Sequence, residues 1–149
     1  MTRLLKTLTL IGLLTGTGTV QADDHLPDKA VMFKTPNCGC CAGHAKHLEE
    51  QGIDVRVIHA SPAQMAKTKA KAGVPHDARS CHTIAMGGYA IEGHVPTPAM
   101  KKLFKEKPDI DGIALAGMPT GTPGMPGPKE GPFKVKSFNG GTLSAFGDF

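Results

Sequence analysis

Three of the four cysteines in this chain fall within four positions, as Cys38, Cys40 and Cys41. The apolar run at residues 30–33 before them predicts a strand, and residues 45–51 after them predict a helix. A turn from a strand into a helix directs backbone N–H groups and the positive end of the helix dipole at its residues. Cysteines placed there lose their protons readily, and thiolates are both nucleophiles and soft metal ligands. The cluster therefore predicts a redox site, a metal site, or a site that is both.

Residues 1–22 have the pattern of a secretory signal peptide. Two basic residues precede an apolar run at residues 8–14, and a small-x-Ala cleavage pattern ends at Ala22. The apolar run is too short to span a membrane, and no later stretch is long and apolar enough to do so. We therefore expect export to the periplasm and a mature chain, residues 23–149, that forms a single domain.

The charge pattern argues against a nucleic-acid partner. Residues 23–149 carry 15 basic and 13 acidic side chains, and many of the lysines are spread along two predicted helices, as on solvated faces. The chain has no Trp and one Tyr, so it offers few aromatic rings on which bases could stack.

The predicted elements follow one another in the order strand, helix, strand, helix, two strands, helix. Strands are expected at residues 29–34 and 53–58, a β-hairpin at 83–92, and helices at 41–51, 62–72 and 97–105. This is the order of an α/β, thioredoxin-like three-layer sandwich, with the cysteines where the first strand meets the first helix. In such folds a cis-proline usually faces the cysteine turn, and Pro96 is the candidate, with its cis or trans state left open.

The C-terminal part changes in composition. Residues 116–132 form a Gly/Pro/Met-rich loop, because no regular element tolerates that density of Gly and Pro. Residues 113–116 before it could be a short strand or an apolar loop. Residues 133–138 alternate and predict a last edge strand, and residues 139–149 are expected to form a flexible tail.

The four cysteines allow structural or enzymatic uses. An even number of cysteines in an exported chain usually forms structural disulfides, but Cys40 and Cys41 are adjacent and cannot readily bridge each other. Cys38 and Cys41 have the Cys-x-x-Cys spacing of redox pairs, so a thiol–disulfide oxidoreductase is the alternative function. Against it, the thiol of Cys40 between them could trap the wrong disulfide.

A metal site is the use that charge balance favours. If all four cysteines converged as thiolates, one Zn²⁺ would leave two negative charges, whereas four Cu⁺ ions would leave none, and excess charge in a partly buried site is costly. Thiolates also select Cu(I), and structural zinc usually uses two ligand pairs, of which the second is missing here. Several Cu(I) ions in a thiolate-bridged cluster are therefore favoured over zinc.

Histidine and methionine side chains form a second tier of candidate ligands. For each of them, an exposed, structural or gap-filling role is the alternative. His82 is considered only because it follows Cys81 in the sequence. The second-tier candidates are His94, Met86, Met118, Met125 and His44.

Four ordered motifs resemble those of the CopG-like family of exported copper-resistance proteins. They are Thr-Pro-x-Cys-x-Cys-Cys, Ser-Cys-His-Thr, Glu-Gly-His-Val-Pro and Gly-Met-Pro-x-Gly-x-Pro-Gly-Met, spread over residues 31–125. The resemblance implies a thioredoxin-like fold that binds Cu(I), including as a multi-copper cluster, and a role in copper resistance with proposed electron transfer or copper redox cycling. The partners it implies are copper ions and other exported copper-handling or electron-transfer proteins. The ligands it implies are Cys38, Cys40, Cys41 and Cys81.

Overall fold

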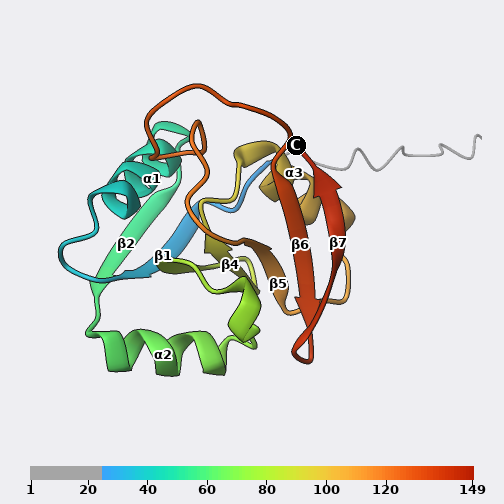
Figure 1. Cartoon of the computed structure of the whole chain (residues 1–149), viewed down its shortest axis with the longest axis horizontal. Helices are drawn as coiled ribbons and strands as arrows, with labels where there is room; N and C mark the ends of the chain where they lie inside the picture. The colour runs from blue at the N-terminus through green and yellow to red at the C-terminus, as the bar shows by residue number, and fades with distance from the viewer. Residues whose placement is uncertain (1–24) are drawn as a thin grey trace, which may run out of the picture.

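Seven strands and three α-helices form the part of the chain that this computed structural model describes, residues 25–149 (Figure 1). The strands are β1 (Lys29–Lys34), β2 (Asp54–His59), β3 (His82–Met86), β4 (Tyr89–Gly93), β5 (Gly112–Leu115), β6 (Lys134–Asn139) and β7 (Thr142–Asp148). The helices are α1 (Gly39–Glu50), α2 (Pro62–Lys71) and α3 (Thr97–Glu106), and a short 3-10 helix, η1 (His76–Ala78), precedes β3. The signal peptide expected at residues 1–22 lies outside the described residues.

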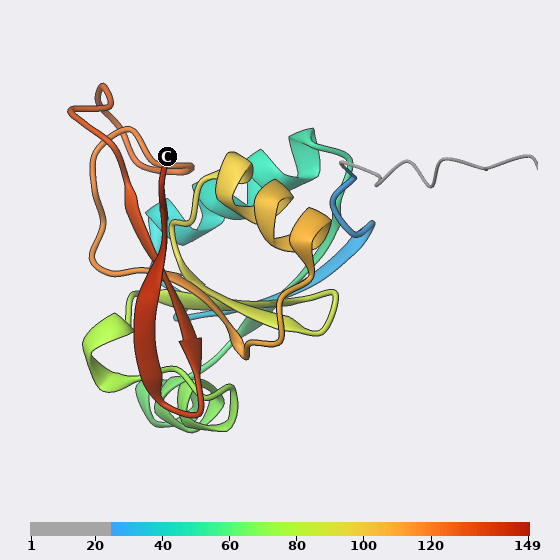
Figure 2. The ribbon, with the colours of Figure 1, turned by 90° about the vertical axis from the view of Figure 1, so that its right-hand side faces the viewer.

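All seven strands join one mixed sheet in the order β2-β1-β3-β4-β5-β6-β7. β1 is parallel to β2 and antiparallel to β3, and β4 is parallel to β5, while the remaining pairs are antiparallel. Helices α1 and α3 cover one face of the sheet and α2 lies on the other (Figure 2). The parallel β1-α1-β2 crossover expected from the sequence is present, because α1 carries the chain from the end of β1 back to the start of β2.

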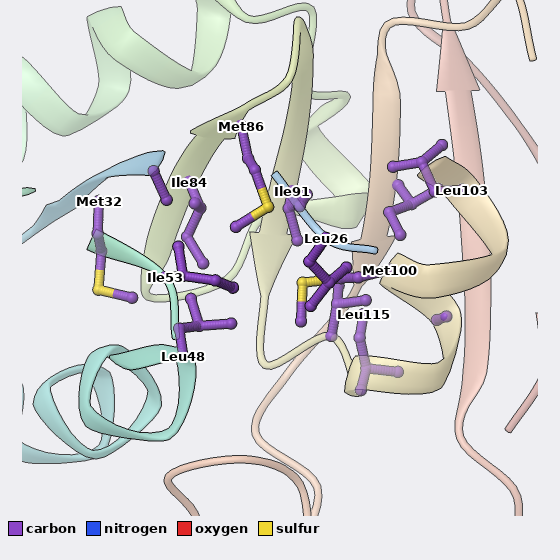
Figure 3. Packing of buried hydrophobic residues seen from close by; sticks show 14 of the residues in the cluster. Leu26, Met32, Leu48, Ile53, Ile84, Met86, Ile91, Met100, Leu103 and Leu115 are labelled. Carbon is purple, nitrogen blue, oxygen red and sulfur yellow. The ribbon is translucent and has the colours of Figure 1, made fainter. Parts of the chain in front are cut away.

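The core lies between the sheet and the pair α1 and α3. Leu48 of α1 and Leu103 of α3 are fully buried, and they pack with residues of the central strands such as Met32, Ile84 and Ile91 (Figure 3). Each such side chain contributes roughly 1.5–3 kcal/mol by leaving water. This core fixes α1 against the sheet, and so it fixes the position of the cysteines at the start of α1.

Local sequence signals explain where the elements start and turn. Ser61 accepts a hydrogen bond from the backbone of Gln64, whose side chain in turn accepts one from the backbone of Ser61, so α2 begins with a capping box. Residues 113–116, left open between strand and loop, lie mostly in β5, where every residue is buried. The Val95–Pro96 peptide bond is trans, since no peptide bond in residues 25–149 is cis.

The C-terminal end differs from the sequence expectation. The predicted edge strand became β6, which lies between β5 and β7, and most of the predicted flexible tail, residues 139–149, forms β7. Asn139 pairs with Thr142 across a two-residue turn, Gly140-Gly141, in which both residues have positive φ. Such a turn matches the twist of paired strands and closes a hairpin. β7 buries little, so its hydrophobic pattern in the sequence is weak.

Candidate metal centre

The topology brings the distant cysteine to the cysteine-rich turn. Cys38 precedes the first residue of α1, and Cys40 and Cys41 lie in its first turn. Because β3 is antiparallel to β1 with Lys34 opposite His82, the residue before β3 lies beside the end of β1. That residue is Cys81. The cysteines that the sequence separates by 40 positions therefore meet at one end of the sheet.

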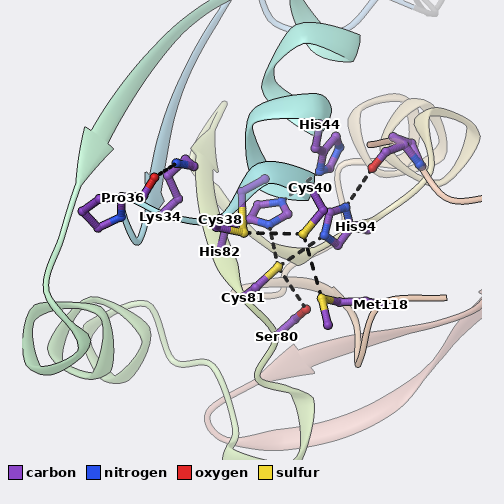
Figure 4. Close-up of a disulfide and its surroundings, with 12 residues drawn as sticks. Lys34, Pro36, Cys38, Cys40, His44, Ser80, Cys81, His82, His94 and Met118 are labelled. Atoms are coloured by element: carbon purple, nitrogen blue, oxygen red, sulfur yellow. Dashed lines mark hydrogen bonds between the residues drawn. A yellow bond between two sulfur atoms is a disulfide. The ribbon is translucent and has the colours of Figure 1, made fainter. Parts of the chain in front are cut away.

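The sulfur atoms of all four cysteines lie within 4.8 Å of one another (Figure 4). Cys41 is buried, and the other three are half-buried. Cys38 and Cys41 form a disulfide, while Cys40 and Cys81 are free thiols, with the sulfur of Cys40 3.5 Å from that of Cys38. The expected convergence is present, but two of the four sulfurs are disulfide-bonded, whereas the cluster hypothesis assumed four thiolates. The Cys-x-x-Cys spacing across the first helical turn places the two Cα atoms 5.3 Å apart, within the range that a disulfide spans.

Helix α1 leaves donors available at this end. No side chain caps its N-terminus, so the backbone N–H groups of the first turn have no side-chain acceptor from the capping position. These groups favour negative charge on the sulfurs of the turn. Cys81 lies outside the turn, and burial and the neighbouring Cys40 raise its pKa to about 11. Cys81 therefore holds its proton at neutral pH unless a cation replaces it.

A second group of potential ligands lies directly beside the cysteines. His44 of α1, His82 of β3 and His94 after β4 are fully buried, and their ring nitrogens lie within 4.8 Å of one another. Burial lowers the pKa of His44 to about 3 and that of His82 to about 2, and it also lowers the pKa of His94. All three rings are therefore neutral at neutral pH, which leaves one nitrogen lone pair on each.

The two groups touch at Cys81. Its Sγ lies 3.3 Å from His82 Nδ1 and 3.3 Å from His94 Nε2 (Figure 4). His94 Nδ1 donates to the carbonyl oxygen of Pro123 at 2.8 Å, and His44 Nδ1 lies 2.8 Å from His82 Nε2. His44 and His94 were second-tier candidates from the sequence. His82 was not among them, although its position after Cys81 was a signal.

The methionine candidates separate into three cases. The thioether of Met118 lies 3.9 Å from the sulfur of Cys40 and is exposed, so it is placed beside the cluster. Met125 is half-buried in the same Gly/Pro/Met-rich loop. For Met86 the structure corrects the sequence prediction of a candidate ligand. Met86 is buried in the hydrophobic core at the far end of β3, because the alternation of that strand turns its side chain inward (Figure 3).

The Gly/Pro/Met-rich loop, residues 116–132, is held against α1 by a close backbone approach. Gly124 has φ of +82°, and a Cβ built there would lie 2.4 Å from the backbone oxygen of Cys40 and 2.4 Å from the nitrogen of His44. Only glycine allows this approach. The loop therefore covers the start of α1, with Pro123 against His94 and Met118 against Cys40.

A buried charge network behind Cys81 was missed by the sequence analysis. Glu92, fully buried in β4, accepts hydrogen bonds from Lys69 Nζ at 2.5 Å and from the backbone N–H of Ser80 at 2.6 Å. Thr83 Oγ1 donates to the other carboxylate oxygen at 2.6 Å. Burial raises the pKa of Glu92, and the charge of Lys69 opposes that rise. The network fixes Ser80 and so the position of Cys81.

Comparisons with known proteins agree with this arrangement. Residues 78–125 match the family model described as a protein of unknown function, DUF411. The chain resembles two solved structures of the copper resistance protein CopG, form 1 with 35% identity and a TM-score of 0.74, and form 2 with 36% and 0.72. Each match covers 83% of this chain and 98% of the solved chain. No curated protein matched the chain.

The fold and site thus define a mixed α/β protein with a cysteine cluster suited to a metal ion. The chain belongs to the CopG family of copper resistance proteins. Within residues 25–149, we find no helix that could cross a membrane.

Proposed function

We propose that this chain is a periplasmic Cu(I)-binding protein of copper resistance. In this proposal Cys38, Cys40, Cys41 and Cys81, once reduced, hold one or more Cu(I) ions through bridging thiolates. The observation that carries the proposal is the convergence of four sulfur atoms from two distant segments within 4.8 Å. Four thiolates are neutralised by four Cu⁺ ions but not by one Zn²⁺, and soft sulfur ligands select Cu(I).

The surroundings of the cluster suit copper as well. The thioether of Met118 is a further soft donor at 3.9 Å from Cys40, and it remains a ligand where thiols are oxidised. The uncapped start of α1 offers N–H groups to thiolate charge. Copper binding at this position would join α1, the loop before β3 and the Gly/Pro/Met-rich loop.

We further propose that the redox state of Cys38 and Cys41 controls the copper load. Their disulfide removes two of the four thiolates. Two electrons and two protons from a dithiol reductant convert it to two thiols, and the dithiol becomes a disulfide. Each thiol then gives up its proton when copper binds. The partners of this cycle would be exported copper-handling or electron-transfer proteins.

We also propose that the chain contains a thioredoxin-like unit and is exported. The β1-α1-β2-α2-β3-β4-α3 order, with β2-β1-β3-β4 side by side, supports a thioredoxin-like unit to which β5, β6 and β7 are added. The signal-peptide pattern of residues 1–22 supports export, and residues 23–149 would then form the mature domain.

The second candidate is a thiol–disulfide oxidoreductase, favoured by the Cys38–Cys41 disulfide itself. The free thiol of Cys40 lies 3.5 Å from the sulfur of Cys38, where its thiolate could attack the disulfide. An enzyme of this kind would exchange the pair rapidly with substrate dithiols and would have little need for Cys81.

An anaerobic Cu(I) titration of the reduced mature protein, read by native mass spectrometry, tests the proposal. We expect several Cu(I) per chain, with the number reduced in both Cys38→Ser and Cys81→Ser variants. Met86→Leu, which changes a thioether in the core, is the matched control and should bind as the parent does. Weak binding together with fast Cys38–Cys41 exchange would favour the oxidoreductase instead.

A further inference from the structure

Cys81 is the residue at which the cysteine cluster meets the buried histidines. Its sulfur lies 3.3 Å from one nitrogen of His82 and 3.3 Å from one nitrogen of His94 (Figure 4). A sulfur and an imidazole nitrogen bound to one metal ion at usual bond lengths stand roughly 3.6–3.8 Å apart, the range from tetrahedral to trigonal geometry. The observed separations are close to that range, so a small shift of the side chains would make room for an ion.

The backbone sets the tautomer of His94. The carbonyl oxygen of Pro123 can only accept a hydrogen bond, so the Nδ1 that lies 2.8 Å from it carries the proton. The neutral ring then has its lone pair at Nε2, the atom that faces Cys81. A backbone carbonyl on the far nitrogen is a common way to orient a metal-binding histidine.

His44 can set the tautomer of His82, as the carbonyl of Pro123 does for His94. His44 Nδ1 lies 2.8 Å from His82 Nε2, so His82 can donate through Nε2 and keep the lone pair of Nδ1 directed at Cys81. His44 Nε2 is buried and has no hydrogen-bond partner among the described residues. Buried polar atoms are seldom left unpaired in a region that serves packing alone. The three buried histidines therefore form a polar cluster, and core packing alone does not explain why these polar rings lie together.

We propose that Cys81, His82 and His94 form a Cu(I) site of their own, with one sulfur and two nitrogen ligands, which shares Cys81 with the thiolate cluster. In this arrangement His44 is a positioning residue for His82. The site deepens the proposed function and rests on it for the identity of the metal. None of its three ligands takes part in the Cys38–Cys41 disulfide, so it remains available when that pair is oxidised.

Charge favours Cu(I) over a divalent ion at this position. When the cluster holds no copper, as in the oxidised protein, two neutral imidazoles and the Cys81 thiolate bring a single negative charge, which one Cu⁺ ion balances and one Zn²⁺ ion exceeds. Copper takes the place of the thiol proton of Cys81, and that proton leaves to the solvent. Imidazole and thiolate are both ligands that copper accepts.

A variant that lacks the other three cysteines isolates the site. The full mature chain with Cys38→Ser, Cys40→Ser and Cys41→Ser would be titrated anaerobically with Cu(I) against a chromogenic Cu(I) chelator. We expect one Cu(I) per chain. X-ray absorption at the copper edge should show one sulfur and the outer-shell scattering of imidazole rings.

Two histidine changes in that background give the comparison. His94→Gln keeps an amide that can donate toward Pro123 but removes the imidazole nitrogen, and it should weaken Cu(I) binding at least tenfold. His76→Gln changes an exposed histidine and should leave binding unchanged. Circular dichroism checks that each variant is folded. If His94→Gln is unfolded, the X-ray absorption of the three-serine variant decides by itself.

The outcomes separate this inference from the proposed function. Several Cu(I) in the reduced parent but none in the three-serine variant would overturn the inference and leave the four-cysteine cluster standing. One Cu(I) in both proteins would support the histidine site and count against the cluster. Copper bound to the three-serine variant without imidazole scattering, and unaffected by His94→Gln, would overturn the inference.

Discussion

At the scale of single residues, Glu92 shows how a buried side chain outside the cysteine cluster holds the position of Cys81. Its buried carboxylate is paired with Lys69 and also accepts the N–H of Ser80, the residue next to Cys81. A buried ion pair contributes little net stability, but breaking it leaves an uncompensated charge. We therefore infer that the main role of the network is to fix the loop before β3.

Glu92→Gln should destabilise the protein by about 3–5 kcal/mol, because it leaves the ammonium of Lys69 buried without a countercharge. Urea unfolding monitored by circular dichroism measures this. The matched control is Glu50→Gln, which breaks the exposed pair with Lys46 and should change the free energy of unfolding by less than about 1 kcal/mol. Equal effects of the two changes would contradict this account of Glu92.

The buried histidines predict a loss of stability in acid. The folded-state pKa of His44 is about 3 and that of His82 about 2, both below the ordinary 6.5, because burial disfavours the charged rings. The unfolded chain therefore binds more protons than the folded one below pH 6.5. Stability should fall from pH 6.5 downward, by up to about 1.4 kcal/mol per pH unit for each histidine.

Urea unfolding of the metal-free protein at pH 7.5, 6 and 5 measures that slope. A His44→Phe variant should show a shallower dependence, since one of the two rings no longer titrates in the unfolded chain. An unfolding free energy that is the same at pH 7.5 and 5 would show that the rings are not held neutral.

At the scale of elements, the Gly/Pro/Met-rich loop completes the site by docking on α1. Its glycines allow backbone to approach backbone, and this approach brings Pro123 to His94 and Met118 to Cys40. Met118 was a second-tier ligand candidate from the sequence, and its thioether lies 3.9 Å from the sulfur of Cys40. For Met125 a role as ligand stays a prediction.

Gly124→Ala should displace this loop. A Cβ at φ of +82° is strained by roughly 1–2 kcal/mol, and it would also overlap the backbone of Cys40 and His44. We expect a lower melting temperature and faster proteolysis within residues 116–132. Gly131→Ala, where a Cβ meets nothing within 4 Å, is the control and should behave as the parent does.

At the scale of the whole molecule, the sheet joins two chemistries at one end. The disulfide and the proposed Cu(I) cluster use two of the same sulfurs, so disulfide formation would exclude full copper loading. The proposed histidine site uses none of the disulfide sulfurs. After oxidation the molecule would therefore still bind copper, but fewer ions than before.

Oxidised protein should accordingly bind fewer Cu(I) ions than reduced protein, and treatment with a dithiol should restore the full number. Native mass spectrometry of both forms, titrated without oxygen, gives the two stoichiometries. Thiol counting confirms two free cysteines in the oxidised form and four in the reduced form. An unchanged copper load after complete oxidation would refute the coupling.

The sequence by itself determined the local structure and the residue types that are candidate ligands. Hydrophobic patterns predicted the helices and strands up to α3 to within about two residues, because these signals act between near neighbours. The motif order also indicated the family.

Which distant residues meet was decided only by tertiary structure. Strand register placed Cys81 and His82 beside the turn. It also buried Met86 on the face covered by α1 and α3, and Glu92 on the opposite face beside Lys69 of α2. β7 also needed a partner strand, because its own sequence buries too little to signal it.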